Sequence, residues 1–180
     1  MDPSIALASR LLGTLVFGCA ALGKLRHYTE FVGVVAHYRL LPAVVSTPVA
    51  QIVIGLELFV GAGLIIPTTT LAAAGCALVL LAVFIVAMSI NLARGRVEID
   101  CGCFQSALRQ RLSAGLVVRN LVLMLLLSPV LIGPAAAAEN ALLPGSGLQI
   151  LDGLAAGVIA FILYQVLGQL LALAHPGRSA

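Results

Sequence analysis

Five long apolar runs constrain the fold of this chain more than any other feature of its sequence. The runs cover about residues 5–23, 45–66, 71–92, 114–132 and 148–174. The hydrocarbon layer of a bilayer is about 30 Å thick, and roughly 20 apolar residues of α-helix cross it. Because an unpaired backbone group is costly in lipid, such runs must be helical. The sequence therefore predicts an all-α, polytopic membrane helix bundle of about five spans, forming one domain over residues 1–180.

Composition supports a membrane protein and argues against a nucleic-acid-binding one. Hydrophobic residues make up 61% of the chain and charged residues 9%, whereas a soluble domain has about 45–50% apolar residues. The net charge is +3, but the ten basic residues are spread along the chain and form no dense patch. The first run follows Met-Asp-Pro-Ser, without the basic segment of a signal peptide, so we expect a retained helix.

Shorter features predict how the spans connect and pack. The run from Phe31 to Leu41 is too short to cross a membrane, has apolar residues at helical spacing and ends at Pro42, which predicts an interfacial or re-entrant amphipathic helix. A tight turn at residues 67–70 makes the second and third spans antiparallel neighbours. Gly153 and Gly157 form a GxxxG pair, which suits a dimer interface or, as we favour, packing within the chain.

The loop from Asn91 to Phe104 carries four charges and half of the four cysteines, and it centres on Cys101-Gly102-Cys103. Two thiols separated by one glycine can cycle between dithiol and disulfide, and the strained small ring is relatively oxidising. The rival uses are metal ligation, for which two more ligands would be needed, and a purely structural turn. Redox chemistry is the favoured use, although a CxC unit alone is a weaker signal than CxxC in a thioredoxin-like context.

Charged residues upstream of the cysteines fit redox use. Arg94 and Arg96 could stabilise a thiolate, whereas Asp100 would oppose it or serve in proton transfer. The other two cysteines, Cys19 and Cys76, lie inside apolar runs and are expected to be small core residues. Cys19 is the better candidate of the two for a disulfide with the loop, because Cys76 lies at the opposite face. No metal site is predicted, since the histidines show no ligand spacing.

A carboxylate in the middle of the second span is the other polar feature of the membrane region. Glu57 must face the bundle interior and be paired or protonated there, with Arg119 as a candidate partner and Lys24 as an alternative. One interpretation is a site for a proton or for a polar ligand such as a quinone headgroup, and the favoured one is a structural ion pair. Arg10 and Asp152 lie near enough to an interface to snorkel without a special role.

Two groups of residues carry a family resemblance. Gly23-Lys24-Leu25, the Tyr38–Pro42 segment and Glu57 in an apolar helix resemble the front half of DoxX-like membrane proteins. The later segment from Asn91 to Phe104 is similar to the cysteine motif of the MauE family of methylamine utilisation proteins. The two together cover about two thirds of the chain. One departure is Gln105, where the motif has a glycine.

This resemblance implies a function in the bacterial inner membrane. The family's role is maturation and disulfide formation of the periplasmic methylamine dehydrogenase small subunit, beside a thioredoxin-like MauD-type protein. The residues carried over are Cys101 and Cys103 as the thiol pair, flanked by Arg94, Arg96 and Asp100. The implied fold is a DoxX-like four-helix core with an added C-terminal helix. A non-enzymatic assembly or docking factor for the same maturation is the alternative, and a transporter is less favoured.

The side of the membrane on which the cysteine loop lies is ambiguous. With five spans, most basic residues outside the spans fall on the face of the loop and only Arg10 falls near the other, so the positive-inside rule predicts a cytoplasmic loop. The family's role favours the periplasm, where thiols can stay oxidised. On these functional grounds we lean towards the periplasm.

Overall fold

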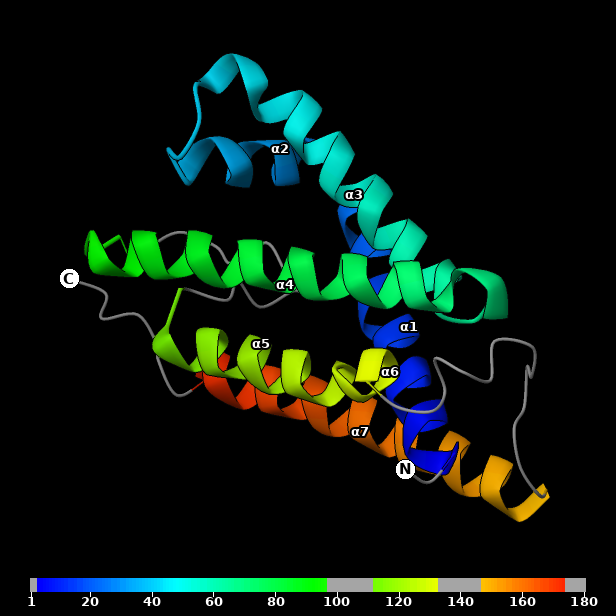
Figure 1. Cartoon of the computed structure of the whole chain (residues 1–180). Coiled ribbons are helices and arrows are strands. Elements are labelled where there is room, and N and C mark those ends of the chain that lie inside the picture. The colour runs from blue at the N-terminus through cyan, green and yellow to red at the C-terminus, as the bar shows by residue number, and fades with distance from the viewer. Residues whose placement is uncertain (1–2, 97–111, 133–146, 174–180) are drawn as a thin grey trace.

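The computed structural model describes residues 3–96, 112–132 and 147–173, and these ranges are helical with no strand (Figure 1). The elements are α1 (Pro3–Arg26), α2 (Tyr28–His37), α3 (Ser46–Gly63), α4 (Thr70–Ala93), α5 (Ala114–Leu127), α6 (Pro129–Ile132) and α7 (Gly147–Leu173), with short 3-10 turns at Ala43–Val45 and Pro67–Thr69.

Five stretches of helix are long and apolar enough to cross a membrane, which confirms the predicted class and number of spans. They cover Ser4–Arg26, Ser46–Gly63, Pro67–Ala93, Ala114–Leu131 and Gly147–Leu170. The short helix predicted between the first two spans is also present as α2, although it begins and ends a few residues earlier than expected. It ends before Arg39, whose φ of 46° lies in the left-handed region, and Pro42 follows closely.

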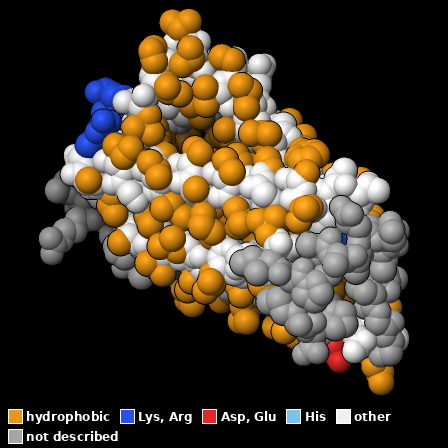
Figure 2. All heavy atoms as spheres, in the orientation of Figure 1, with side chains coloured by type: hydrophobic (Ala, Val, Ile, Leu, Met, Phe, Trp, Pro, Cys, Tyr) orange, Lys and Arg blue, Asp and Glu red, His pale blue; other side chains and the backbone are white. Residues whose placement is uncertain are grey.

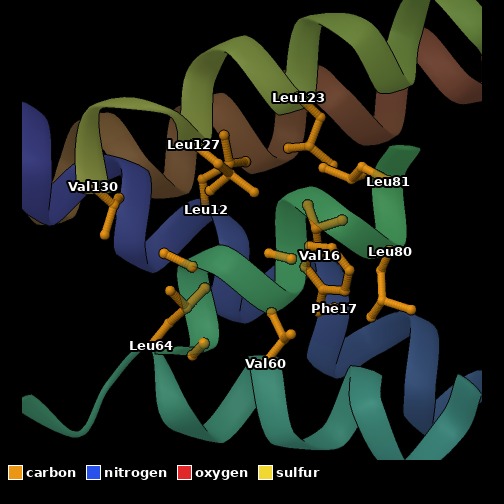
Figure 3. Close-up of a cluster of buried hydrophobic side chains, with 13 residues drawn as sticks. Leu12, Val16, Phe17, Val60, Leu64, Leu80, Leu81, Leu123, Leu127 and Val130 are labelled. Carbon is orange, nitrogen blue, oxygen red and sulfur yellow. The ribbon is translucent and has the colours of Figure 1, made fainter. Parts of the chain in front are cut away.

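In Figure 1 the helices α4, α5 and α7 lie in a row, and α2 and α3 form the upper part of the molecule, where α3 also packs against α4. Helix α1 joins the two parts, because it packs against both α7 and α3. The main core lies between α1, α3, α4 and α5, and Figure 3 shows Phe17, Val60, Leu80 and Leu123 pointing into it. Many large apolar side chains instead cover the outer surface (Figure 2), as expected where lipid replaces water.

Close helix contacts depend on glycine. A Cβ added at Gly61 in α3 would lie 3.1 Å from the backbone nitrogen of Gly18 in α1. One added at Gly157 in α7 would lie 2.9 Å from Leu11 Cβ in α1, and Gly153 meets Leu7 in the same way. The GxxxG pair therefore packs within the chain, as the sequence analysis favoured.

Replacing Gly61 with leucine should force α1 and α3 apart and lower the free energy of unfolding by about 1–3 kcal/mol. The matched control is Gly55→Leu in the same helix, where nothing lies within 4 Å of an added Cβ. Unfolding of the two purified variants in mixed micelles, followed by circular dichroism, measures the difference. Equal stability of the two variants would contradict the packing described for Gly61.

Arg10 has a more specific role than the snorkelling expected of it. Its Nε donates to the carbonyl oxygen of Leu64 at 2.9 Å, and its Nη2 donates to that of Ile65 at 3.1 Å. These carbonyls follow the last turn of α3, where helix geometry leaves backbone acceptors without partners. Arg10 thus ties the start of α1 to the end of α3.

Candidate functional site

A buried ion pair joins the end of α1 to the middle of α3. The Nζ of Lys24 lies 2.8 Å from Oε1 and 2.9 Å from Oε2 of Glu57. Each residue is 1% exposed, in helices that are long and apolar enough to span a membrane. Because the two charges are desolvated together and hydrogen-bonded to each other, the carboxylate can remain ionised in this environment.

Two aromatic rings complete the surroundings of the Lys24 ammonium. Its Nζ lies 5.3 Å from the centre of the Phe31 ring and 6.0 Å from that of Phe84. Both distances are within the range of cation–π attraction. Phe31 comes from the short helix α2 and Phe84 from α4, so the ion pair is enclosed by side chains from all four of these helices.

A cavity of about 160 Å³ opens beside the ion pair. Lys24 lies in its wall, and the rest of the lining comes from α2, α3, α4 and the residues that follow α2. The lining residues are Lys24, Phe31, Val34, Val35, Tyr38, Leu40, Leu41, Val49, Val53, Val83, Phe84, Ala87 and Met88. In Figure 2 a hollow separates the upper part of the molecule from the helix row below it.

Arg119 was the first candidate for the partner of Glu57, and Lys24 was the alternative. In the structure Lys24 makes the ion pair. Arg119 is also buried, at 2% exposed, and its Cζ lies 4.7 Å from the centre of the Tyr164 ring. This contact connects α5 with α7. Sequence spacing could not separate the two partners, because the choice depends on how the helices cross.

Two buried amides that were not predicted as functional residues lie in the last turn of α4 and midway along α5. Asn91 is 0% and Asn120 is 2% exposed. Asn91 Nδ2 donates to the carbonyl oxygen of Ala87 at 3.0 Å, and Asn120 Nδ2 lies 4.0 Å from the sulfur of Met88. Asparagine inside an apolar run is the signal that could have found them, because such side chains bond between helices in membranes.

The segment that leads to the cysteines leaves α4 in a fixed direction. The amide of Gly95 donates to Leu92 O at 3.0 Å, and the amide of Arg96 donates to Asn91 O at 3.0 Å. This pair of bonds, with Gly95 at φ +70°, is a Schellman motif, which needs a residue that tolerates the left-handed region. Arg94 caps the helix and is exposed.

The predicted thiol pair itself lies outside the residues that the structure describes, together with Asp100 and Gly102. The other two cysteines are described and carry free thiols. Cys19 is exposed on α1, so the expectation that it is a core residue was wrong, while Cys76 is partly buried and packs against the main core as expected. Over the described ranges, no three His, Cys, Asp or Glu residues gather closely enough to hold a metal ion.

Comparison with known proteins identifies the family. The family model described as methylamine utilisation protein MauE matches residues 1–134. A curated MauE protein of Paracoccus denitrificans is 42% identical over 164 residues, covering 91% of this chain and 86% of its own length. The MauE protein of Paracoccus versutus is 41% identical over 163 residues, which are 91% of this chain and 85% of the relative. That of Methylorubrum extorquens is 40% identical over 119 residues, or 66% of this chain and 64% of the relative.

No solved structure matches the chain, so the DoxX-like arrangement of the core stays a prediction from sequence. The matched region contains the buried ion pair, the cavity-lining residues and the cysteine loop. The match over most of the chain, together with five candidate membrane spans, shows that this multi-pass membrane protein belongs to the MauE family of methylamine utilisation proteins.

Proposed function

We propose that this protein is a membrane thiol–disulfide redox protein that assists maturation and disulfide formation of the periplasmic methylamine dehydrogenase small subunit. Its reacting groups are Cys101 and Cys103, and its partner is a thioredoxin-like MauD-type protein. The observation that carries this proposal is the Cys-Gly-Cys unit within the region that matches the MauE family model.

The chemistry is an exchange of one disulfide for another. A thiolate of one protein attacks the disulfide of the other, so that one S–S bond forms while another breaks and a mixed disulfide results. The second thiolate of the attacking protein then attacks the mixed disulfide and releases its partner as a dithiol. Two electrons pass between the proteins in either direction.

Residues around the cysteines would support this exchange. Arg94 and Arg96 bring positive charge to the start of the loop, which favours thiolate over thiol. Asp100 precedes Cys101 and would take up or release the thiol proton, and Gly102 permits the tight ring. The Schellman motif at Gly95 supports the proposal, because it holds the beginning of the loop in one orientation relative to α4.

The proposed setting is the bacterial inner membrane, with the chain as one integral domain and the cysteine loop at the periplasmic face. A periplasmic loop would meet an exported partner directly and could stay oxidised there. The arginines near the loop would then act on the thiols instead of orienting the chain.

Labelling with a membrane-impermeant maleimide in intact cells tests the redox state and the face together. Cys19 and Cys76 are first replaced by alanine, so that only Cys101 and Cys103 can react. We expect little labelling before reduction and labelling of both thiols after a membrane-permeant reductant has been added and removed. Complete labelling before reduction, whether or not the dehydrogenase is being made, would contradict a disulfide-cycling loop.

A further inference from the structure

We propose that the cavity between α2, α3 and α4 binds the ring of a membrane quinone, with a ring carbonyl oxygen facing the Nζ of Lys24. The cavity volume of about 160 Å³ is close to the roughly 150 Å³ of an apolar protein cavity that takes up benzene. A single six-membered ring therefore fits within it.

The charge beside the cavity selects for an uncharged ligand with an acceptor atom. Among the described residues that line it, Lys24 is the one with an ionised side chain. An ammonium group donates hydrogen bonds and accepts none, so the ligand atom facing it must be an acceptor. Because Glu57 already neutralises Lys24 at 2.8 Å, a carbonyl suits the site better than a carboxylate or phosphate, which would add an unbalanced charge to a buried position.

The shape of the lining favours a flat, apolar body. The rings of Phe31, Phe84 and Tyr38 contribute to the wall, and most of the remaining lining is aliphatic. Flat ligand rings pack favourably against aromatic side chains in offset or edge-to-face contact. Leu40 and Leu41 also line the cavity and are exposed, at 38% and 49%. An isoprenoid tail could therefore leave past them into the surrounding lipid.

A quinone at this position would be the electron acceptor of the proposed thiol–disulfide function. Its role as electron acceptor therefore rests on that function. Oxidation of two thiols to a disulfide releases two electrons and two protons. Reduction of a quinone to a quinol takes up two of each. Binding of the ring depends only on the cavity and the ion pair, so it can be measured without any thiol chemistry.

Binding of decylubiquinone to the purified full-length protein in lipid nanodiscs tests the site. Ala87 lines the cavity from α4, so the ring added by Ala87→Phe would occupy part of the cavity. This variant should bind decylubiquinone about tenfold or more weakly, which is a loss of binding free energy of about 1.4 kcal/mol or more. Ala82→Phe is the matched control, because Ala82 lies exposed on the same helix and does not line the cavity. It should leave the dissociation constant unchanged. Equal binding by the two variants would overturn the proposal.

A second variant tests the polar contact. Replacing both charges together, as Lys24→Met with Glu57→Leu, removes the donor without leaving a buried unpaired charge. This double variant should unfold close to the thermal midpoint of the unmodified protein and bind decylubiquinone several-fold more weakly. Undiminished binding, or binding of oleate in place of decylubiquinone by the unmodified protein, would show that the cavity does not select a neutral carbonyl ligand.

The failures of the two proposals are distinguishable. A Cys101→Ser variant should bind decylubiquinone as tightly as the unmodified protein does, because the proposed contacts to the ring come from Lys24 and from the cavity residues of α2, α3 and α4. Loss of quinone binding in Ala87→Phe with thiol exchange retained would support the binding site and remove only its link to the cysteines. Retained quinone binding in Ala87→Phe would overturn the binding site and leave the thiol proposal standing.

Discussion

Replacing Cys101 or Cys103 with serine should reduce the yield of mature methylamine dehydrogenase in cells by on the order of 100-fold, because each thiol is needed for a different half of the exchange. The membrane protein itself should still be made at its normal level, since serine is close to cysteine in size. Dehydrogenase activity in periplasmic extracts, together with an immunoblot of the membrane fraction, measures both effects.

The matched controls for these variants are Cys19→Ser and Cys76→Ser. Cys19 is exposed on α1 and Cys76 packs against the main core, so neither should change the yield of mature dehydrogenase strongly. If both loop variants kept full yield, the thiol mechanism would be wrong and a docking factor that needs no thiol would explain the phenotype better.

Replacing Lys24 alone with methionine should lower the free energy of unfolding by about 3–5 kcal/mol, because it leaves the Glu57 carboxylate buried without its cation. Adding Glu57→Leu should recover most of that loss, since an apolar pair leaves no buried charge. Thermal unfolding of the purified variants in one detergent gives the ordering directly.

Arg26→Met is the control for this cycle. Arg26 belongs to the same last turn of α1 as Lys24 but is exposed, so its loss should change stability by less than about 1 kcal/mol. If Lys24→Met and Arg26→Met were equally stable, the buried ion pair would have no structural importance.

The number and type of spans could be predicted from the sequence because lipid leaves the backbone few choices. An apolar run of about 20 residues has to be helical in a bilayer, and all five predicted runs correspond to candidate spans. The short helix α2 was predicted by the same means, since its run is apolar and helical in spacing but too short to cross. The end of α2 was less certain, because the left-handed conformation of Arg39 has no signature in the sequence.

The contacts between helices were harder to predict. Glu57 was expected to need a partner, but whether Lys24 or Arg119 supplies it depends on helix crossing, which the periodicity of one run does not encode. The position of Phe31 over Lys24 is unpredictable for the same reason. Arg10 was assigned to the interface, whereas its guanidinium binds two carbonyls at the end of α3. These contacts join residues from different helices.

The start of the cysteine loop and the two buried amides have signals in the sequence. Gly95 could have been predicted as a helix C-terminal glycine, because it follows the last apolar turn directly and lies next to basic residues. The buried amides of Asn91 and Asn120 also had a sequence signal, as polar residues within apolar helices. Neither the glycine nor the amides carry a charge, so the pattern of charged residues does not reveal them.

Trapping of a mixed disulfide tests the central claim most directly. In a background without Cys19 and Cys76, a Cys101→Ser or Cys103→Ser variant keeps one loop thiol that can form a bond to the partner but cannot complete the exchange. We expect at least one of the two variants to yield a reductant-sensitive adduct with the thioredoxin-like protein in cells growing on methylamine, and the variant that lacks both loop cysteines to yield none. The absence of an adduct from both single variants, in cells where the unmodified protein supports dehydrogenase maturation, would contradict a thiol–disulfide function for this loop.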